Sequence, residues 1–153
     1  MPKEYHLLFV CTANICRSPM AEGFASILGQ RLGISVQARS GGTMNLKGHP
    51  PASNAIKTMK KEGIDISNLR SSGVSANDVE WADYILTMEP KHAAKLREAF
   101  GEAEQKILIL ANFGGKMEIE DPVGKWIFRF HSTRKEIKKC ILGFLSELAK
   151  REA

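Results

Sequence analysis

Short apolar runs alternate along this chain with longer segments in which apolar residues recur every three or four positions. Such runs are typical of strands buried in a parallel sheet, and the longer segments are typical of helices that pack on it. Strands that alternate with helices are joined by right-handed crossovers. The sequence therefore predicts a single α/β domain over residues 1–153, with a four-stranded, doubly wound parallel sheet that carries helices on both faces.

The expected strands cover residues 5–10, 34–39, 83–88 and 106–110. The expected helices run from Pro19 to about Leu32 and over residues 50–62, 77–82, 92–100 and about 128–150. Proline at a helix start and glycine after a helix end, such as Pro50 and Gly63, support these limits. Residues 64–75 and 111–124 are expected to be irregular. Because ligands of doubly wound sheets bind beyond the carboxyl ends of the strands, a site is expected in the loop after the first strand.

Hydrophobic residues make up 43% of the chain and charged residues 25%, which are ordinary values for a globular protein. This composition excludes a disordered tail, a collagen-like fibre and a disulfide scaffold. No apolar run approaches the roughly 18 residues of a membrane span, and the first residues do not resemble a signal peptide. We therefore expect a cytoplasmic protein without a membrane partner, whose cysteines, Cys11, Cys16 and Cys140, stay reduced.

The net charge of +5 is compatible with anionic partners. The signal is weak, because much of the excess comes from lysines on expected helix faces, as in residues 57–61 and 135–139. We therefore expect a phosphorylated substrate rather than nucleic acid, and a chain that is a monomer or a weak dimer.

The loop after the first expected strand carries a cysteine and an arginine on either side of five residues, in the order Cys11-Thr12-Ala13-Asn14-Ile15-Cys16-Arg17-Ser18-Pro19. Successive N–H groups in a tight loop form a nest for an anion, and the following helix adds positive charge at its N-terminus. Arg17 adds a planar fork that matches two phosphate oxygens. This positive field favours the thiolate form of Cys11, which is a nucleophile. Ser18 is expected to cap the helix and to donate to the thiolate. The residues expected to bind phosphate are Thr12, Ala13, Asn14, Ile15, Cys16, Arg17 and Ser18.

Residues 11–22 resemble the signature of the low-molecular-weight protein tyrosine phosphatase family, with the sequence Cys11-Thr12-Ala13-Asn14-Ile15-Cys16-Arg17-Ser18-Pro19-Met20-Ala21-Glu22. The resemblance continues in family order through residues 40–43, 63–65 and 82–88, and then through Asp121-Pro122. It therefore covers essentially the whole chain, and its first motif is highly specific.

The resemblance implies a double-displacement mechanism on tyrosine-phosphorylated proteins. Cys11 would attack phosphorus to form a cysteinyl-phosphate, while Arg17 and the loop amides hold the equatorial oxygens. Asp121 would protonate the leaving oxygen and then act as a base toward the water that hydrolyses the intermediate. No metal or other cofactor is expected, since Arg17 and the amides supply the positive charge and the four histidines have no ligand spacing.

The resemblance also implies roles for neighbouring residues. Asn14 resembles the family asparagine that holds the loop in shape, and asparagine tolerates the left-handed backbone that a tight nest requires. Cys16 is expected either as a redox partner of Cys11, as in the family, or as a small packed side chain. Cys140 is expected in the core on the last helix, and His131 at the surface.

Three positions depart from the family pattern. Ala13 stands where the family usually has glycine, which removes backbone freedom from the loop. Leu69 stands where a histidine commonly supports the asparagine, and Val123 replaces the aromatic residue that usually lines the substrate slot. Either Trp126 or Phe128 supplies the missing wall, or the slot is shallower. These departures bear on substrate preference more than on the chemistry.

Other activities stay open on this sequence. Arsenate reduction by a related thiol enzyme needs further cysteines, which those relatives carry near residues 87–89 and this chain lacks there. Protein-arginine phosphatases resemble this loop but have threonine at the position of Ile15, whose apolar side chain favours an aromatic phosphate. A non-catalytic phosphate-binding regulator or a basic nucleic-acid module is disfavoured by the intact Cys11, Arg17 and Asp121.

Overall fold

A four-stranded parallel sheet forms the centre of the protein in a computed structural model that describes residues 3–152. The strands lie in the order β2-β1-β3-β4 and run over Glu4–Cys11 (β1), Ser35–Gly42 (β2), Tyr84–Thr87 (β3) and Ile107–Ile109 (β4). All three pairings are parallel, so the carboxyl ends of the strands meet at one edge of the sheet. The predicted fold class is confirmed.

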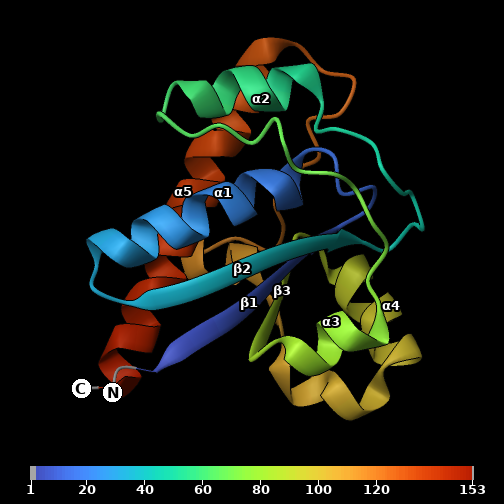
Figure 1. Ribbon diagram of the computed structural model, residues 1–153, viewed down its shortest axis with the longest axis vertical. Helices are drawn as coiled ribbons and strands as arrows, with labels where there is room; N and C mark the ends of the chain where they lie inside the picture. The colour runs from blue at the N-terminus through green and yellow to red at the C-terminus, as the bar shows by residue number, and fades with distance from the viewer. Residues whose placement is uncertain (1–2, 153) are drawn as a thin grey trace.

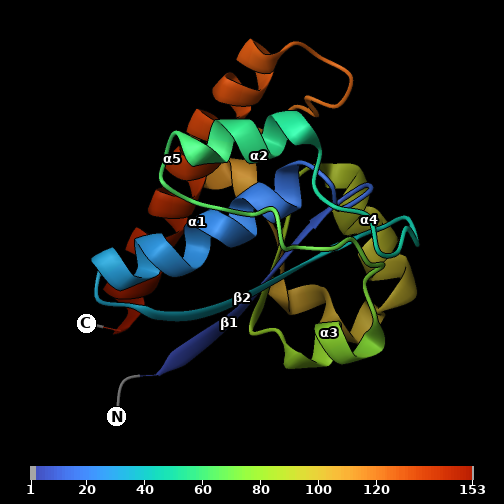
Figure 2. The same ribbon diagram turned by 45° about the horizontal axis from the view of Figure 1, so that its top comes forward.

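Helices cover both faces of this sheet (Figures 1 and 2). The α-helices are Arg17–Arg31 (α1), Ser53–Lys60 (α2), Ala76–Trp81 (α3), Pro90–Ala99 (α4) and Ile127–Glu152 (α5). On one face α1 packs on β1 and β2 and also contacts α5, and α2 packs against α5. On the other face α3 lies against β1, and α4 lies against β3 and β4.

The alternation of side chains along β1 divides the core into two parts. Leu7 and Phe9 belong to the larger cluster, with residues of α1 and α5, whereas Leu8 and Val10 belong to the smaller one beneath α3 and α4. All four side chains are fully buried, as expected for a central strand of a sheet covered on both faces. This uninterrupted apolar run is the reason that the first strand was recognisable in the sequence.

Several element limits differ from the sequence prediction. The strand expected over residues 34–39 continues to Gly42, because its backbone stays paired with β1 as far as Cys11. A side chain at Gly42 would bring its Cβ to 2.6 Å from the carbonyl oxygen of Thr12, so glycine permits this close approach. Two 3₁₀ helices were not predicted: η1 over Gly101–Lys106, and η2 over Leu110–Gly114 at the start of the segment expected to be irregular.

The helices end close to their expected limits. The largest difference is in α2, which begins three residues later than the expected start at residue 50 and ends two residues before residue 62. The expected core position of Cys140 on α5 is confirmed, because this side chain is fully buried. Across residues 3–152, none of the helices combines the length and the apolar character needed to cross a bilayer.

Candidate active site

The loop that joins β1 to α1 lies at the carboxyl edge of the sheet. Together with the end of β1 and the first residues of α1 it is called here the Cys11 loop (residues 11–18). Four of its carbonyl oxygens accept hydrogen bonds of 2.8–3.2 Å from backbone amides elsewhere: Cys11 from Thr43, Thr12 from Met44, Ile15 from Ala52 and Cys16 from Met20. In the described part of the chain, by contrast, no backbone N–H of residues 12–16 donates to a protein group. Carbonyls at both ends of the loop are thus occupied while its amides remain available, which is the arrangement of an anion nest.

Asn14 holds this loop in shape through its side chain and its backbone. Its φ of 60° is left-handed, as predicted from the sequence. Its Nδ2 donates to Ser18 Oγ at 2.8 Å and to Ser40 Oγ at 2.9 Å, and its Oδ1 accepts from the Ser72 amide at 3.1 Å. The Ser72 amide therefore supplies the partner that Leu69 cannot offer. Ala13 has no positive φ, so alanine is accommodated at this position without strain.

Ser18 lies within hydrogen-bond distance of Cys11, with 3.0 Å between Oγ and Sγ. Because the Ser18 oxygen already accepts from Asn14, its own hydrogen is available to the sulfur. The expectation that Ser18 caps the helix is wrong: the N-cap position belongs to Cys16, and Ser18 lies inside the first turn of α1. Its hydroxyl is directed at the sulfur instead.

Arg17 is the largest fully buried side chain in the described chain, with 1% of its surface exposed. One guanidinium nitrogen donates to Glu89 Oε2 at 2.6 Å and to the Ile119 carbonyl at 2.7 Å. Burial alone would raise the pKa of Glu89, but the hydrogen bond and charge of Arg17 outweigh it and lower that pKa. Glu89 is therefore ionised, and it fixes the cation beside the Cys11 loop.

Asp121 lies at the same site although it is distant in sequence. Its Oδ2 lies 3.5 Å from the second guanidinium nitrogen of Arg17, and its Oδ1 accepts the Val123 amide at 3.0 Å. Its segment is called here the Asp121 loop (residues 115–126). A hydrogen bond from the Ile119 amide to the carbonyl of Met88 joins this loop to the residue that follows β3. The structure thus brings together the three residues that the sequence predicts as catalytic, although more than a hundred positions separate Asp121 from Arg17.

These groups enclose a pocket of about 200 Å³. Its lining consists of Cys11, Thr12, Ala13, Ile15, Cys16, Arg17, Met44, Asp121 and Val123. The sulfur, the cation and the carboxylate thus face one small cavity, together with apolar surface from Ile15, Met44 and Val123. A thiol, a fixed cation and free amides in one cavity are suited to attack on a bound tetrahedral oxyanion.

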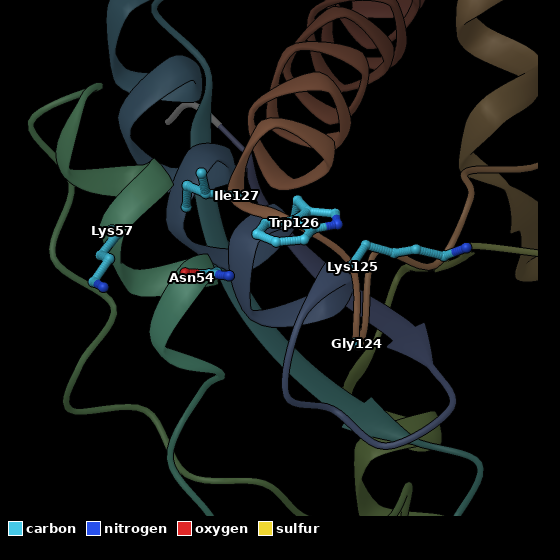
Figure 3. A pocket seen from close by; sticks show the side chains of 6 residues that line it. All are labelled: Asn54, Lys57, Gly124, Lys125, Trp126 and Ile127. Carbon is cyan, nitrogen blue, oxygen red and sulfur yellow. The ribbon is translucent and has the colours of Figure 1, made fainter.

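Of the two alternatives for the missing wall, the one in which Trp126 or Phe128 supplies it is wrong, because neither side chain lines this pocket. Val123 itself lines the pocket, so the shallower slot is the alternative that remains. Trp126 instead lines a neighbouring open hollow between α2 and the start of α5 (Figure 3). Lys57 and Lys125 border this hollow from opposite sides and point away from each other.

The remaining cysteine and histidine candidates have the following positions. Cys16 is buried beside the pocket, and this burial, with the charge of Asp121, raises the pKa of its thiol to about 12. Its redox role stays a prediction. His131 is half-buried rather than at the surface, and its Nδ1 lies 2.6 Å from Thr58 Oγ1 on α2. Among residues 3–152, no three His, Cys, Asp or Glu side chains are grouped so that they could hold a metal ion.

Sequence reasoning missed Glu89, His92 and Ile119. His92 is almost fully buried and lies 2.9 Å from Thr12 Oγ1 through its Nε2. Glu89 and His92 form a capping box at the start of α4, directly after β3. An acidic residue followed three positions later by a polar side chain at a strand end is a signal that was available in the sequence. The contact of Ile119 with Arg17 involves only its carbonyl, for which side-chain patterns give no signal.

Comparison with known proteins agrees with this geometry. A family model described as low molecular weight phosphotyrosine protein phosphatase matches residues 6–153. A protein-arginine-phosphatase of Geobacillus stearothermophilus is 34% identical over 90% of this chain and 91% of its own length. An arsenate reductase of Staphylococcus epidermidis is 34% identical over 90% of this chain and 94% of its own length. The crystal structure of a low molecular weight protein tyrosine phosphatase from T. tengcongensis has a TM-score of 0.89 and 35% identity, covering 94% of this chain and 99% of the other. The chain belongs to the low molecular weight phosphotyrosine protein phosphatase family.

Proposed function

We propose that this phosphatase hydrolyses phosphotyrosine in proteins through a cysteinyl-phosphate on Cys11. The observation that carries the proposal is the convergence of the Cys11 sulfur, the buried Arg17 cation and free loop amides on one cavity. A phosphoryl group seated in that cavity has its equatorial oxygens held by Arg17 and the amides, which stabilise the charge of the transition state. The sulfur then attacks phosphorus in line with the leaving oxygen.

The proposal assigns two roles to Asp121. In the first step its proton passes to the leaving phenolate oxygen, and the bond between phosphorus and that oxygen breaks as the sulfur–phosphorus bond forms. In the second step the resulting carboxylate takes a proton from the water that attacks the cysteinyl-phosphate, which releases phosphate and restores the thiolate. Its place at the pocket, 3.5 Å from Arg17, supports both roles.

The apolar part of the pocket supports an aromatic substrate. Ile15, Met44 and Val123 line the cavity, and their side chains offer no hydrogen-bond donor and no acceptor stronger than the Met44 sulfur. A phenyl ring buries its faces against such surface, whereas a guanidinium would lose hydrogen bonds to water there. Phosphotyrosine therefore fits this lining better than phosphoarginine.

Phosphoarginine is the second candidate, and the similarity to a protein-arginine-phosphatase favours it. The two candidate substrates lead to different expectations for kcat/KM, which can be tested at Ile15. If tyrosine is the substrate residue, Ile15→Thr removes apolar contact with the ring and lowers kcat/KM for phosphotyrosine. If arginine is the substrate residue, the unmodified protein should already have the higher kcat/KM on phosphoarginine, even though its side chain at position 15 is apolar.

The test compares two peptides that differ only in the phosphorylated residue. We expect the unmodified protein to have the higher kcat/KM on the phosphotyrosine peptide, and Ile15→Thr to shift the ratio toward phosphoarginine. The matched control is Ile15→Val, which keeps the branched shape without a hydroxyl and preserves the ratio. A higher kcat/KM on the phosphoarginine peptide in the unmodified protein would overturn the proposal.

A further inference from the structure

His92 joins two parts of the site that are distant in sequence. It lies in the first turn of α4, is 1% exposed, and contacts Thr12 in the Cys11 loop and Glu89 beside Arg17. A buried histidine with hydrogen bonds on both ring nitrogens has a defined orientation. None of the roles assigned above uses this side chain.

The two contacts determine which nitrogen carries the hydrogen. The Glu89 amide donates to Nδ1 at 3.1 Å, so Nδ1 is the acceptor of the ring. The other nitrogen, Nε2, therefore carries the hydrogen and donates it to Thr12 Oγ1 at 2.9 Å. Burial, reinforced by the charge of Arg17, lowers the pKa of His92 to about 4, which keeps the ring neutral and this assignment intact near pH 7.

The hydrogen bond from His92 determines the orientation of the Thr12 hydroxyl. Its oxygen accepts from His92, and within residues 3–152 the hydroxyl has no acceptor of its own. Thr12 also lines the pocket that holds Cys11 and Arg17. We propose that His92 is a positioning residue that directs the Thr12 hydroxyl hydrogen toward the phosphoryl oxygens of the bound substrate. This inference rests on the proposed phosphatase function, to which it adds one oriented donor.

The variants that test the proposal must preserve the capping box. Asp78, at the equivalent position of α3, closes a capping box with the Ser75 amide through its short side chain. His92→Asn has the same reach, so it retains the acceptor for the Glu89 amide but does not extend to Thr12. Thr12→Val removes the hydroxyl with little change of shape, and Thr12→Ser retains it.

The experiment is a double-mutant cycle on kcat/KM for nitrophenyl phosphate. We expect His92→Asn and Thr12→Val each to lower kcat/KM by about tenfold, since each loses one hydrogen bond to a charged group. The double variant should be no slower than either single variant, because both changes remove the same donor. Thr12→Ser restores the hydroxyl, so it should recover most of the rate lost in Thr12→Val, and adding His92→Asn to it should again lower kcat/KM about tenfold.

A second measurement separates this proposal from the proposed function. Inorganic phosphate binding by calorimetry, in a Cys11→Ser background, should weaken by a similar factor in both single variants and no further in the double variant. A parent protein inactive on aryl phosphates would overturn the proposed function, whereas the binding cycle would still report on Thr12 and His92. If the parent is active but the losses of His92→Asn and Thr12→Val add up in the double variant, the role proposed for His92 is overturned while the proposed function stands. An unchanged rate in Thr12→Val would have the same meaning. Thermal unfolding of each variant confirms that it is folded.

Discussion

The Cys11 loop and the Asp121 loop border the same pocket but have opposite surroundings. The Cys11 loop is buried, and hydrogen bonds reach it from β2, from the segment before α2 and from α4. The Asp121 loop is anchored through Ile119 and Pro122 and is exposed beyond them, with Trp126 79% exposed. The first loop therefore has one shape, fixed by many partners. The second presents mostly exposed side chains beside the pocket.

This difference suggests a division between reaction and selectivity in the proposed function. The groups proposed to bind phosphate and attack phosphorus lie where burial strengthens electrostatic interactions. The groups proposed to lie near the leaving residue are in a loop whose exposed side chains can change at little cost in stability. Changes to the buried loop should therefore affect all substrates alike, and changes to the exposed loop should affect substrates unequally.

The largest effect is expected at the nucleophile of the buried loop. Cys11→Ser should abolish turnover on every phosphate ester, because a serine hydroxyl is far less ionised than the thiol it replaces. Vanadate or phosphate binding should remain measurable by calorimetry, since Arg17 and the amides are unchanged. Turnover by this variant would contradict the covalent mechanism. Lys125→Ala, in the exposed loop, is the matched control and should retain full activity on nitrophenyl phosphate.

Arg17→Lys should lower kcat/KM on all esters by about 10²–10³-fold, the usual cost of removing one preorganised donor to a transition-state oxyanion. An ammonium keeps the charge but cannot make two parallel hydrogen bonds. It also cannot contact Glu89 and Ile119 as the guanidinium does. Rates on phosphotyrosine and nitrophenyl phosphate should fall by the same factor. Unequal losses would mean that the buried loop also selects substrates.

Asp121→Asn should separate substrates by their leaving groups. Tyrosine has a pKa near 10, so its phenolate leaves slowly without a proton donor, whereas a nitrophenolate leaves readily. In single-turnover measurements, cysteinyl-phosphate formation from phosphotyrosine should slow by about 10²–10⁴-fold, and formation from the nitrophenyl ester far less. Equal losses on both esters would leave Asp121 as a turn residue, and the donor would then be sought among Glu118, Glu120 and His131.

The buried region should also make stability depend on pH. The pKa of His92 is lowered from 6.5 to about 4 in the folded protein, so between these values the unfolded chain binds a proton that the folded protein does not. The free energy of unfolding should therefore fall as the pH drops from about 6.5 toward 4. The loss is about 2 kcal/mol once solvent screening is allowed for. Denaturant titrations should reveal this slope in the parent and a shallower one in His92→Asn. Identical slopes would count against a neutral buried imidazole.

The smallest effect is expected on the exposed side. Trp126→Ala should change the free energy of unfolding by less than about 0.5 kcal/mol and leave nitrophenyl phosphate hydrolysis unchanged. For a phosphotyrosine peptide long enough to reach the hollow in Figure 3, KM should rise a few-fold. Met117→Ala, equally exposed but outside that hollow, is the control. The same KM in all three proteins would confine substrate contact to the pocket itself.

The sequence allowed prediction of the fold class and of the Cys11 loop because both depend on contiguous residues. Residues 11–18 carry their chemistry in one stretch, and the buried run before them identifies the strand that presents it. Asp121 was found only through the resemblance to a family. Glu89 and His92 could have been identified as a helix start from their spacing, but not as partners of the Cys11 loop. They reach that loop only when β3 lies beside β1, and sequence patterns do not determine strand order. The choice between a wall from Trp126 or Phe128 and a shallower slot could not be made, because exposed side chains have no periodic signal.

Ile119 links the exposed loop to the buried cation. Its side chain is fully buried, its amide is bound to Met88, and its carbonyl is bound to Arg17. Residues 123–126 lie beyond both Ile119 and the buried Pro122, so we expect that changes among them leave the Arg17 guanidinium in place. The positive charge of the pocket is thus held separately from the exposed surface beside it.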